Sequence, residues 1–162
     1  MIKRFPIRLV ALLMFGLIAG CGLYSFSGSN LPPNIKTVSI PLFENQASEF
    51  GVDQQLTNSL IAAVNRDNTL KIGNPRSSDS VLRGTILAFE ERAGQYNRNE
   101  TASTFRIYIT IKVQFEDVNK KNTIWEETWT QWGEYDSNRN DGISQAVEKL
   151  STEVMNRLVS SW

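Results

Sequence analysis

The segment from Thr104 to Glu116, with the sequence TFRIYITIKVQFE, alternates between apolar and polar side chains without a break. Every odd position is apolar, and every even position is polar or amphipathic. This period of two over thirteen residues predicts one long strand with a single buried face, because a helix would scatter the apolar side chains around its circumference. The strand must therefore lie inside a sheet, with apolar groups covering its odd face.

The remaining segments predict two helices and several further strands. Val52 to Arg66 carries a wide apolar stripe at helical spacing. Apolar residues also recur every three or four positions after Asp141, which predicts a helix over Gly142 to Ser160 with Asp141 as its N-cap. The predicted strands are Ile35 to Phe43, Val81 to Arg92, Thr104 to Glu116 and Ile124 to Trp132, with at most a short strand at Leu70 to Ile72.

The order of these elements predicts an α+β fold. Short polar connections at Gly94 to Ala102 and Val118 to Thr123 join the three later strands as antiparallel hairpins. The helix after the first strand is a crossover, which lets that strand run parallel to a neighbour. We therefore expect a two-layer sandwich, with two helices packed on one face of a four-stranded mixed sheet.

Two residues predict local features of the strands. Pro41 has no N–H to donate, so the first strand is expected to lie at a sheet edge or to end its pairing there. Gly84 is expected either to allow close approach of a covering helix or to mark a β-bulge.

The composition argues against enzymatic chemistry. The chain has no histidine and one cysteine, which excludes histidine-based triads, the common zinc sites and thiol redox pairs. Three pairs of adjacent carboxylates occur, but neighbouring residues of a strand point to opposite faces and cannot form an acid/base dyad. These pairs are Glu90 with Glu91, Glu116 with Asp117, and Glu126 with Glu127. We expect no catalytic residue, no metal and no cofactor apart from a covalent lipid.

The N-terminus has the pattern of a bacterial lipoprotein signal. Met1 to Arg8 carries three positive charges, and Leu9 to Ile18 is an apolar run of ten residues. A helix of that length is about 15 Å long, roughly half the hydrocarbon thickness of a bilayer, so it does not span one. The small residues before Cys21 resemble a lipobox, in which the thiol accepts a diacylglyceryl group. An ordinary signal peptide with an incidental cysteine is the alternative.

Three regions follow from this interpretation. Residues 1–20 are the signal peptide, residues 21–34 are the acylated N-terminus and a tether able to reach about 40 Å, and residues 35–162 are the folded domain. Gly22 follows the cysteine, and no aspartate stands there to indicate retention in the inner membrane, so the periplasmic face of the outer membrane is expected. Removal of the signal leaves fourteen cations against seventeen anions, which predicts no nucleic-acid partner.

In its order of segments the chain resembles the LptE family of lipopolysaccharide-assembly lipoproteins. The matching segments are CGLYSFSGSNLPPNIKTVSIPLFEN, DNTLKI, SVLRGTI, RIYITIKVQFED and the terminal helix, which together cover Cys21 to Trp162. The resemblance implies an outer-membrane lipoprotein with two helices on a four-stranded sheet. It also implies a place in the lumen of the β-barrel translocon LptD, where the lipoprotein aids assembly of the barrel and helps deliver lipopolysaccharide to the outer leaflet.

The resemblance implies roles for a few residues. Cys21 matches the lipid-bearing cysteine of the family. Members of the family are thought to meet lipopolysaccharide through basic residues in loops beside the sheet, and the matching loops contain Arg98 and Arg139. A guanidinium can bridge two phosphate oxygens, although each arginine can equally be an exposed loop charge. The acidic balance of the mature chain favours a scaffold over a lipid carrier.

Two other functions are compatible with the sequence. The VSIPLFEN and SVLRGTI segments also resemble periplasmic lipoproteins of secretion and surface-fibre assembly, whose partner would be a homo-oligomeric export pore. Neighbouring genes for lipopolysaccharide transport or for fibre secretion would distinguish these two functions. A periplasmic hydrolase is a third possibility, for which the sequence offers no catalytic motif.

Overall fold

The computed structural model describes residues 31–95 and 103–160. The elements in chain order are β1 (Thr37–Ser39), β2 (Glu44–Asn45), α2 (Val52–Asp67), β3 (Lys71–Ile72), β4 (Ser80–Ala93), β5 (Phe105–Asp117), β6 (Asn122–Tyr135) and α3 (Arg139–Val159). The expected signal peptide, Cys21, the tether up to residue 30 and Arg98 lie outside the described residues. None of the helices in the described ranges has the length and apolar character needed to cross a bilayer.

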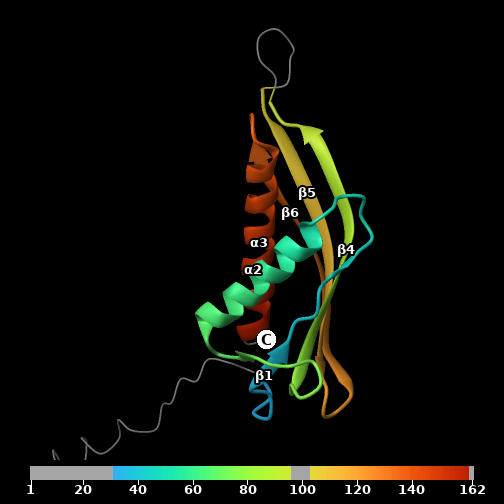
Figure 1. Cartoon of the computed structure of the whole chain (residues 1–162), viewed down its shortest axis with the longest axis vertical. Coiled ribbons are helices and arrows are strands. Elements are labelled where there is room, and N and C mark those ends of the chain that lie inside the picture. Colours follow the sequence, from blue (N-terminus) through green and yellow to red (C-terminus); the bar gives the residue numbers. More distant parts are fainter. Residues whose placement is uncertain (1–30, 96–102, 161–162) are drawn as a thin grey trace, which may run out of the picture.

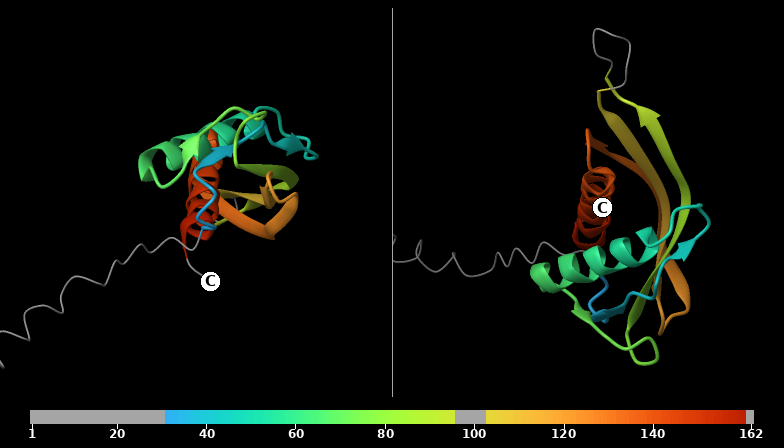
Figure 2. Two further views of the ribbon diagram at one scale, coloured as in Figure 1. Left: turned by 90° about the horizontal axis from the view of Figure 1, so that it is seen from below. Right: turned by 45° about the horizontal axis from the view of Figure 1, so that its top comes forward.

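β4, β5 and β6 are the long strands that form the main part of the sheet. Both helices lie on the same side of it (Figures 1 and 2). The strand order is β3-β1-β4-β5-β6, and β2 pairs with β4 outside this path. β4, β5 and β6 are antiparallel, as the two predicted hairpins require. β1 runs parallel to both β3 and β4, which confirms the parallel pairing expected from the crossover helix.

The prediction of four strands is wrong, because the sheet has six strands within the part of the chain that the structure describes. β3 corresponds to the short strand considered at Leu70 to Ile72, whereas β2 lies between the first predicted strand and the first predicted helix, where no strand is predicted. Two-residue strands are too short to show a side-chain period, so their pairing depends on neighbouring strands and leaves no pattern in the sequence. The α+β class with two helices is confirmed.

The first predicted strand is also much shorter than expected. β1 ends at Ser39, two residues before Pro41, so its pairing stops before the proline as predicted. β1 is not an edge strand, because β3 and β4 pair with its two sides. The chain then resumes pairing only at β2, which lies parallel to β4.

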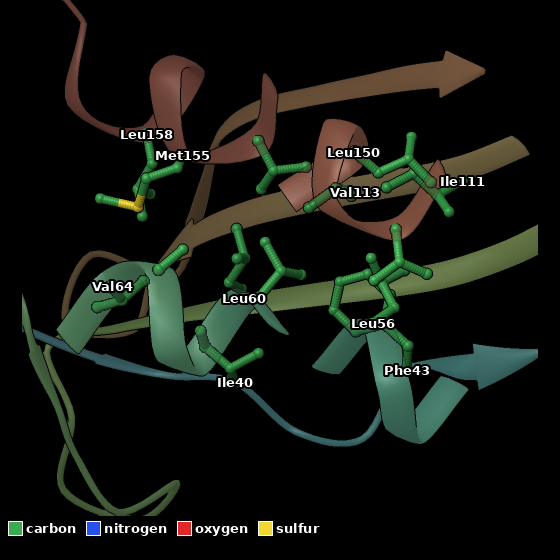
Figure 3. Packing of buried hydrophobic residues seen from close by; sticks show 14 of the residues in the cluster. Ile40, Phe43, Leu56, Leu60, Val64, Ile111, Val113, Leu150, Met155 and Leu158 are labelled. Atoms are coloured by element: carbon green, nitrogen blue, oxygen red, sulfur yellow. The ribbon is translucent and has the colours of Figure 1, made fainter. Parts of the chain in front are cut away.

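The core lies between the inner face of the sheet and the two helices. The odd positions of β5 from Ile107 to Phe115 are fully buried, as the alternation predicts. Leu56 and Leu60 of α2 and Leu150 of α3 pack over them (Figure 3). Each such side chain contributes about 1.5–3 kcal/mol when fully removed from water, so this alternation accounts for much of the fold's stability.

Gly84 allows a close approach to β4, but the approaching group is a side chain and not a helix. A Cβ at Gly84 would lie 1.9 Å from the ring of Phe43, which covers this part of β4. The bulge considered for this residue occurs a little further along, where the pairing of β4 with β5 shifts between Ile86 and Ala88. The glycine therefore makes room for a core phenylalanine.

The last helix begins earlier than predicted. Its N-cap is Asn138, whose side-chain oxygen accepts from the backbone N–H of Asn140 at 3.2 Å, and Asp141 lies in the first turn. Both residue types are good N-caps, and the sequence alone does not rank them. As a consequence, Arg139 is the first residue of α3 and does not belong to the preceding loop.

Candidate functional site

Arg139 lies at the centre of a cluster that joins four separate segments. Its two terminal nitrogens donate to the two carboxylate oxygens of Glu49, each at 2.8 Å. Its Nε donates to Glu91 of β4 at 2.8 Å, and its guanidinium lies 5.0 Å from the ring centre of Phe89. The hydroxyl of Tyr135, at the end of β6, donates to the other oxygen of Glu91 at 2.5 Å.

These contacts keep both carboxylates ionised. The hydrogen bonds from Arg139 hold the pKa of Glu49 below its ordinary value. The Tyr135 hydroxyl, followed by Arg139, has the same effect on the pKa of Glu91. Burial and the neighbouring Glu91 raise the pKa of Tyr135, so the phenol stays protonated and remains a donor. The cluster therefore carries two negative charges and one positive charge at neutral pH.

The geometry bears directly on the predicted role of Arg139. Nε and both terminal nitrogens of its guanidinium donate to carboxylates, in the planar arrangement that arginine adopts with paired oxygens. A lipid phosphate would have to compete with Glu49 or Glu91 for these donors. Contact between lipopolysaccharide and Arg139 stays a prediction, and Arg98 lies outside the described residues.

Sequence reasoning missed the partners of Arg139. Glu49 and Glu91 are 90 and 48 residues away along the chain, and nothing in their local sequence indicates that they meet. The neighbouring Phe50 was also missed, although a single aromatic residue in an otherwise polar loop was a visible signal.

The outer face of the sheet, on the side away from the helices, is broad and polar. Four cations on it each pair with a carboxylate. These pairs are Arg83 with Glu116 at 3.4 Å, Arg92 Nε with Glu90 at 3.1 Å, Arg106 with Glu134 at 2.6 Å and Lys112 with Glu126 at 2.8 Å. The hydroxyls of Thr110 and Thr130 hydrogen-bond to each other at 2.8 Å. They lie between the Arg106–Glu134 pair and the Lys112–Glu126 pair. In the described residues the face is therefore neutral and its charges are paired, which suits contact with a polar protein surface better than capture of an anion.

Aromatic rings lie among these charges at one end of the outer face. Tyr108 and Trp132 are directly opposite each other on β5 and β6. Arg106 lies 4.6 Å and the Lys149 ammonium 4.1 Å from the Trp132 ring centre. Arg92 lies 4.9 Å from the Tyr108 ring centre. Cations over ring faces stabilise the surface and leave less ring area for stacking by a ligand.

A second polar cluster fixes the chain where it enters the domain. Asp79 accepts from the backbone N–H groups of Lys36 and Thr37 at 3.1 and 3.0 Å, which lowers the pKa of its carboxyl. The amide of Asn34 donates to the buried Asp117 at 3.0 Å. Leu31 packs against the core. Residues 31–34, the end of the expected tether, thus contact the domain.

The carboxylate pairs behave as their strand positions predict. Glu90 pairs with Arg92 on the outer face, whereas Glu91 contacts Tyr135 and Arg139 on the inner face. No group of side chains suited to a metal ion occurs in residues 31–95 and 103–160.

A groove of about 290 Å³ lies between α2 and α3. The two helices are in contact there, because the Ser151 hydroxyl donates to the Ser59 hydroxyl at 2.8 Å.

This arrangement of two helices on one face of a mixed sheet occurs in several solved structures. The PelC dodecamer from Paraburkholderia phytofirmans is 13% identical, with 82% of this chain and 95% of PelC covered and a TM-score of 0.60. The hypothetical protein CT253 from Chlamydia trachomatis is 10% identical, with 76% and 95% covered and a TM-score of 0.59. XCC0632 from Xanthomonas campestris is 10% identical, with 81% and 90% covered and a TM-score of 0.57. At such identities the similarity shows the fold alone.

The family follows from the sequence match. No curated protein matches the chain. The family model LptE, described as lipopolysaccharide-assembly, matches residues 35–160. The chain therefore belongs to the LptE family, and at family level its role is in lipopolysaccharide assembly.

Proposed function

We propose that this chain is an outer-membrane lipoprotein that acts with an LptD-like β-barrel translocon to insert lipopolysaccharide into the outer leaflet. The family match over residues 35–160 carries this proposal. In this proposal the domain is a non-catalytic plug and scaffold. A lipid on Cys21 holds it at the periplasmic face, residues 1–20 are removed, and residues 21–34 link the lipid to the domain.

The outer face of the sheet supports a scaffold role. Its four paired cations and its exposed threonines present hydrogen-bonding groups without a net charge. Such a face fits a polar protein wall, because each charge is already compensated and no isolated ion has to be buried. We propose that it lies against the barrel.

For lipopolysaccharide itself we propose a secondary contact at Arg98. The guanidinium of Arg98 would meet a phosphate of the lipid as the family resemblance implies. Arg139 is the less suitable test residue, because charge reversal there would also break its pairs with Glu49 and Glu91.

Co-purification tests the main proposal. The tagged full-length chain is expressed with its own LptD-like barrel, extracted from outer membranes in mild detergent and isolated. We expect the barrel in near-stoichiometric amount, together with bound lipopolysaccharide. Isolation of an export pore of a secretion system in place of the barrel would contradict the proposal and favour the alternative.

Charge reversal separates lipid contact from scaffolding. Arg98→Asp should weaken lipopolysaccharide binding by the purified chain severalfold to about tenfold, which corresponds to about 1.4 kcal/mol or less. Arg76→Asp, in the exposed loop between β3 and β4, is the matched control. Equal binding by both variants would leave scaffolding as the only role.

The similarity to the PelC dodecamer does not favour the export-complex alternative. At 13% identity the likeness shows a shared fold. Because one fold serves many functions, the family match is the more specific observation.

A further inference from the structure

Phe50 is the most exposed large apolar side chain in the described residues. It is 97% exposed, while the next, Leu42, is 55% exposed. A phenylalanine left in water forgoes the stabilisation that burial in the core would provide. Its exposure therefore makes no contribution to folding and leaves the ring available for contact with another molecule.

The loop that carries Phe50 is held on both sides. Before it, Glu49 pairs with Arg139 through both carboxylate oxygens, and the Glu49 carbonyl accepts from the Asn45 side chain at 2.6 Å. After it, Gly51 adopts a positive φ of 81°, which few other residues tolerate, and its carbonyl accepts the first helical bond of α2, from Gln55. The phenylalanine is therefore presented outward by a loop whose own polar groups are satisfied.

Further exposed apolar residues lie along the same edge of the sheet. Leu42 precedes β2, Phe50 follows it, and Leu87 lies in β4, the strand with which β2 pairs. Phenylalanine is enriched in the centres of protein interfaces, and the two leucines add exposed apolar area on the same part of the fold.

The charges around this edge select the kind of partner. From Leu42 to Gln55 the chain carries three carboxylates, Glu44, Glu49 and Asp53, and no cation. Glu49 pairs with Arg139, and Glu44 and Asp53 have no ion-pair partner in the described residues, so the segment that carries Phe50 provides a negative rim. Anionic lipid headgroups would be repelled by such a rim, whereas an apolar pocket bordered by lysine or arginine would complement it.

We propose that Phe50 is an anchor that enters an apolar pocket with a cationic rim on the protein partner, and that the Arg139–Glu49 pair positions it. The inference rests on the proposed function, in which that partner is the barrel. It assigns Arg139 a positioning role, because its guanidinium holds Glu49, the residue next to the anchor.

Dissociation of the complex tests the anchor. The tagged full-length chain and its barrel are co-expressed, isolated, and challenged with excess untagged chain while loss of the barrel is followed. We expect Phe50→Ala to dissociate at least about tenfold faster than wild type. Val118→Ala removes an apolar side chain that is 41% exposed in the β5–β6 turn and is expected to match wild type. Arg139→Met should fall between the two.

The outcomes distinguish failure of the anchor from failure of the proposed function. If wild type retains the barrel and Phe50→Ala retains it equally long, the anchor is wrong while the proposed function stands. If wild type retains no barrel, the proposed function fails and the anchor fails with it. A melting temperature of Phe50→Ala equal to that of wild type shows that a faster loss is not caused by unfolding.

Cross-linking identifies what Phe50 touches. A photoreactive benzoylphenylalanine is placed at position 50 of the full-length chain in intact outer membranes, and adducts are identified by mass. An adduct with the barrel supports the proposal. An adduct with lipid, an adduct with a second copy of the chain, or the absence of any adduct overturns it.

Discussion

A Cβ added to Gly133 would lie 1.9 Å from the carbonyl oxygen of Gly142, so β6 and the first turn of α3 meet backbone against backbone. This contact sets the position of the turn that also contains Arg139. The close contact between Gly133 of β6 and Gly142 of α3 therefore helps to place the Arg139 guanidinium within reach of Glu49 and Glu91.

Replacement of Gly133 should therefore be costly. Gly133→Ala must push α3 away from β6, and overpacking of this kind costs about 1–3 kcal/mol. Gly142→Ala is the comparison variant and should cost less, because its new Cβ would meet the side chains of Tyr135 at 3.0 Å and Ile107 at 3.3 Å and because alanine favours the helix. Urea unfolding measures both, and a Gly133→Ala midpoint equal to that of wild type would show that the contact is easily relaxed.

A carboxylate should destabilise the fold much more on the inner face of β5 than on its outer face. Ile109 is fully buried, and Ile109→Asp places a carboxylate in the core at a cost of several kcal/mol. Thr110 points to the outer face, where its hydroxyl pairs with Thr130, so Thr110→Asp should cost about 1 kcal/mol or less. Thermal unfolding of the two variants checks this, and equal melting temperatures would contradict the assignment of faces.

The Arg139 cluster should stabilise the fold in a pH-dependent way. In the folded chain the pKa values of Glu49 and Glu91 lie below the ordinary value of about 4.3. Their contribution is therefore fully present above about pH 4.3 and is lost as the pH falls through the lowered folded-state pKa values. Because these side chains are 25–39% exposed, we expect about 1 kcal/mol in total at pH 7.

Comparison of Arg139→Met with wild type measures this contribution. The variant should be less stable by about 1 kcal/mol at pH 7, and the difference should shrink below pH 4 as Glu49 and Glu91 become protonated. Arg76→Met, at an exposed loop position, should show little difference at either pH. A constant difference between wild type and Arg139→Met from pH 7 to pH 3 would mean that the arginine stabilises the fold by packing and not by charge.

The lipid anchor has its own test. Cys21→Ser should abolish incorporation of labelled palmitate, because serine lacks the thiol that accepts the diacylglyceryl group. The variant should remain an unlipidated precursor, because the acyl chains that would anchor the tether are never attached. Labelling of the variant, or a wild type that never incorporates palmitate, would contradict the lipoprotein interpretation.

Long periodic segments were predictable from the sequence. The alternation from Thr104 to Glu116 identified β5 and its buried face, and the apolar stripe from Val52 to Val64 identified the buried face of α2. In both cases the side-chain period is a property of the segment itself, and burial of the apolar face is the largest favourable term in folding. Such segments therefore reveal their structure without knowledge of their neighbours.

Short and contact-dependent features were decided only by the tertiary structure. β2 and β3 are two residues long and form because β4 and β1 are available to pair with them. The pairing of Arg139 with Glu49 and the exposure of Phe50 likewise depend on where α3, β4 and the loop before α2 meet. An arginine has the same local sequence whether its guanidinium faces water, lipid or a carboxylate 90 residues away, because its electrostatic energy depends on distance in space and not on distance along the chain.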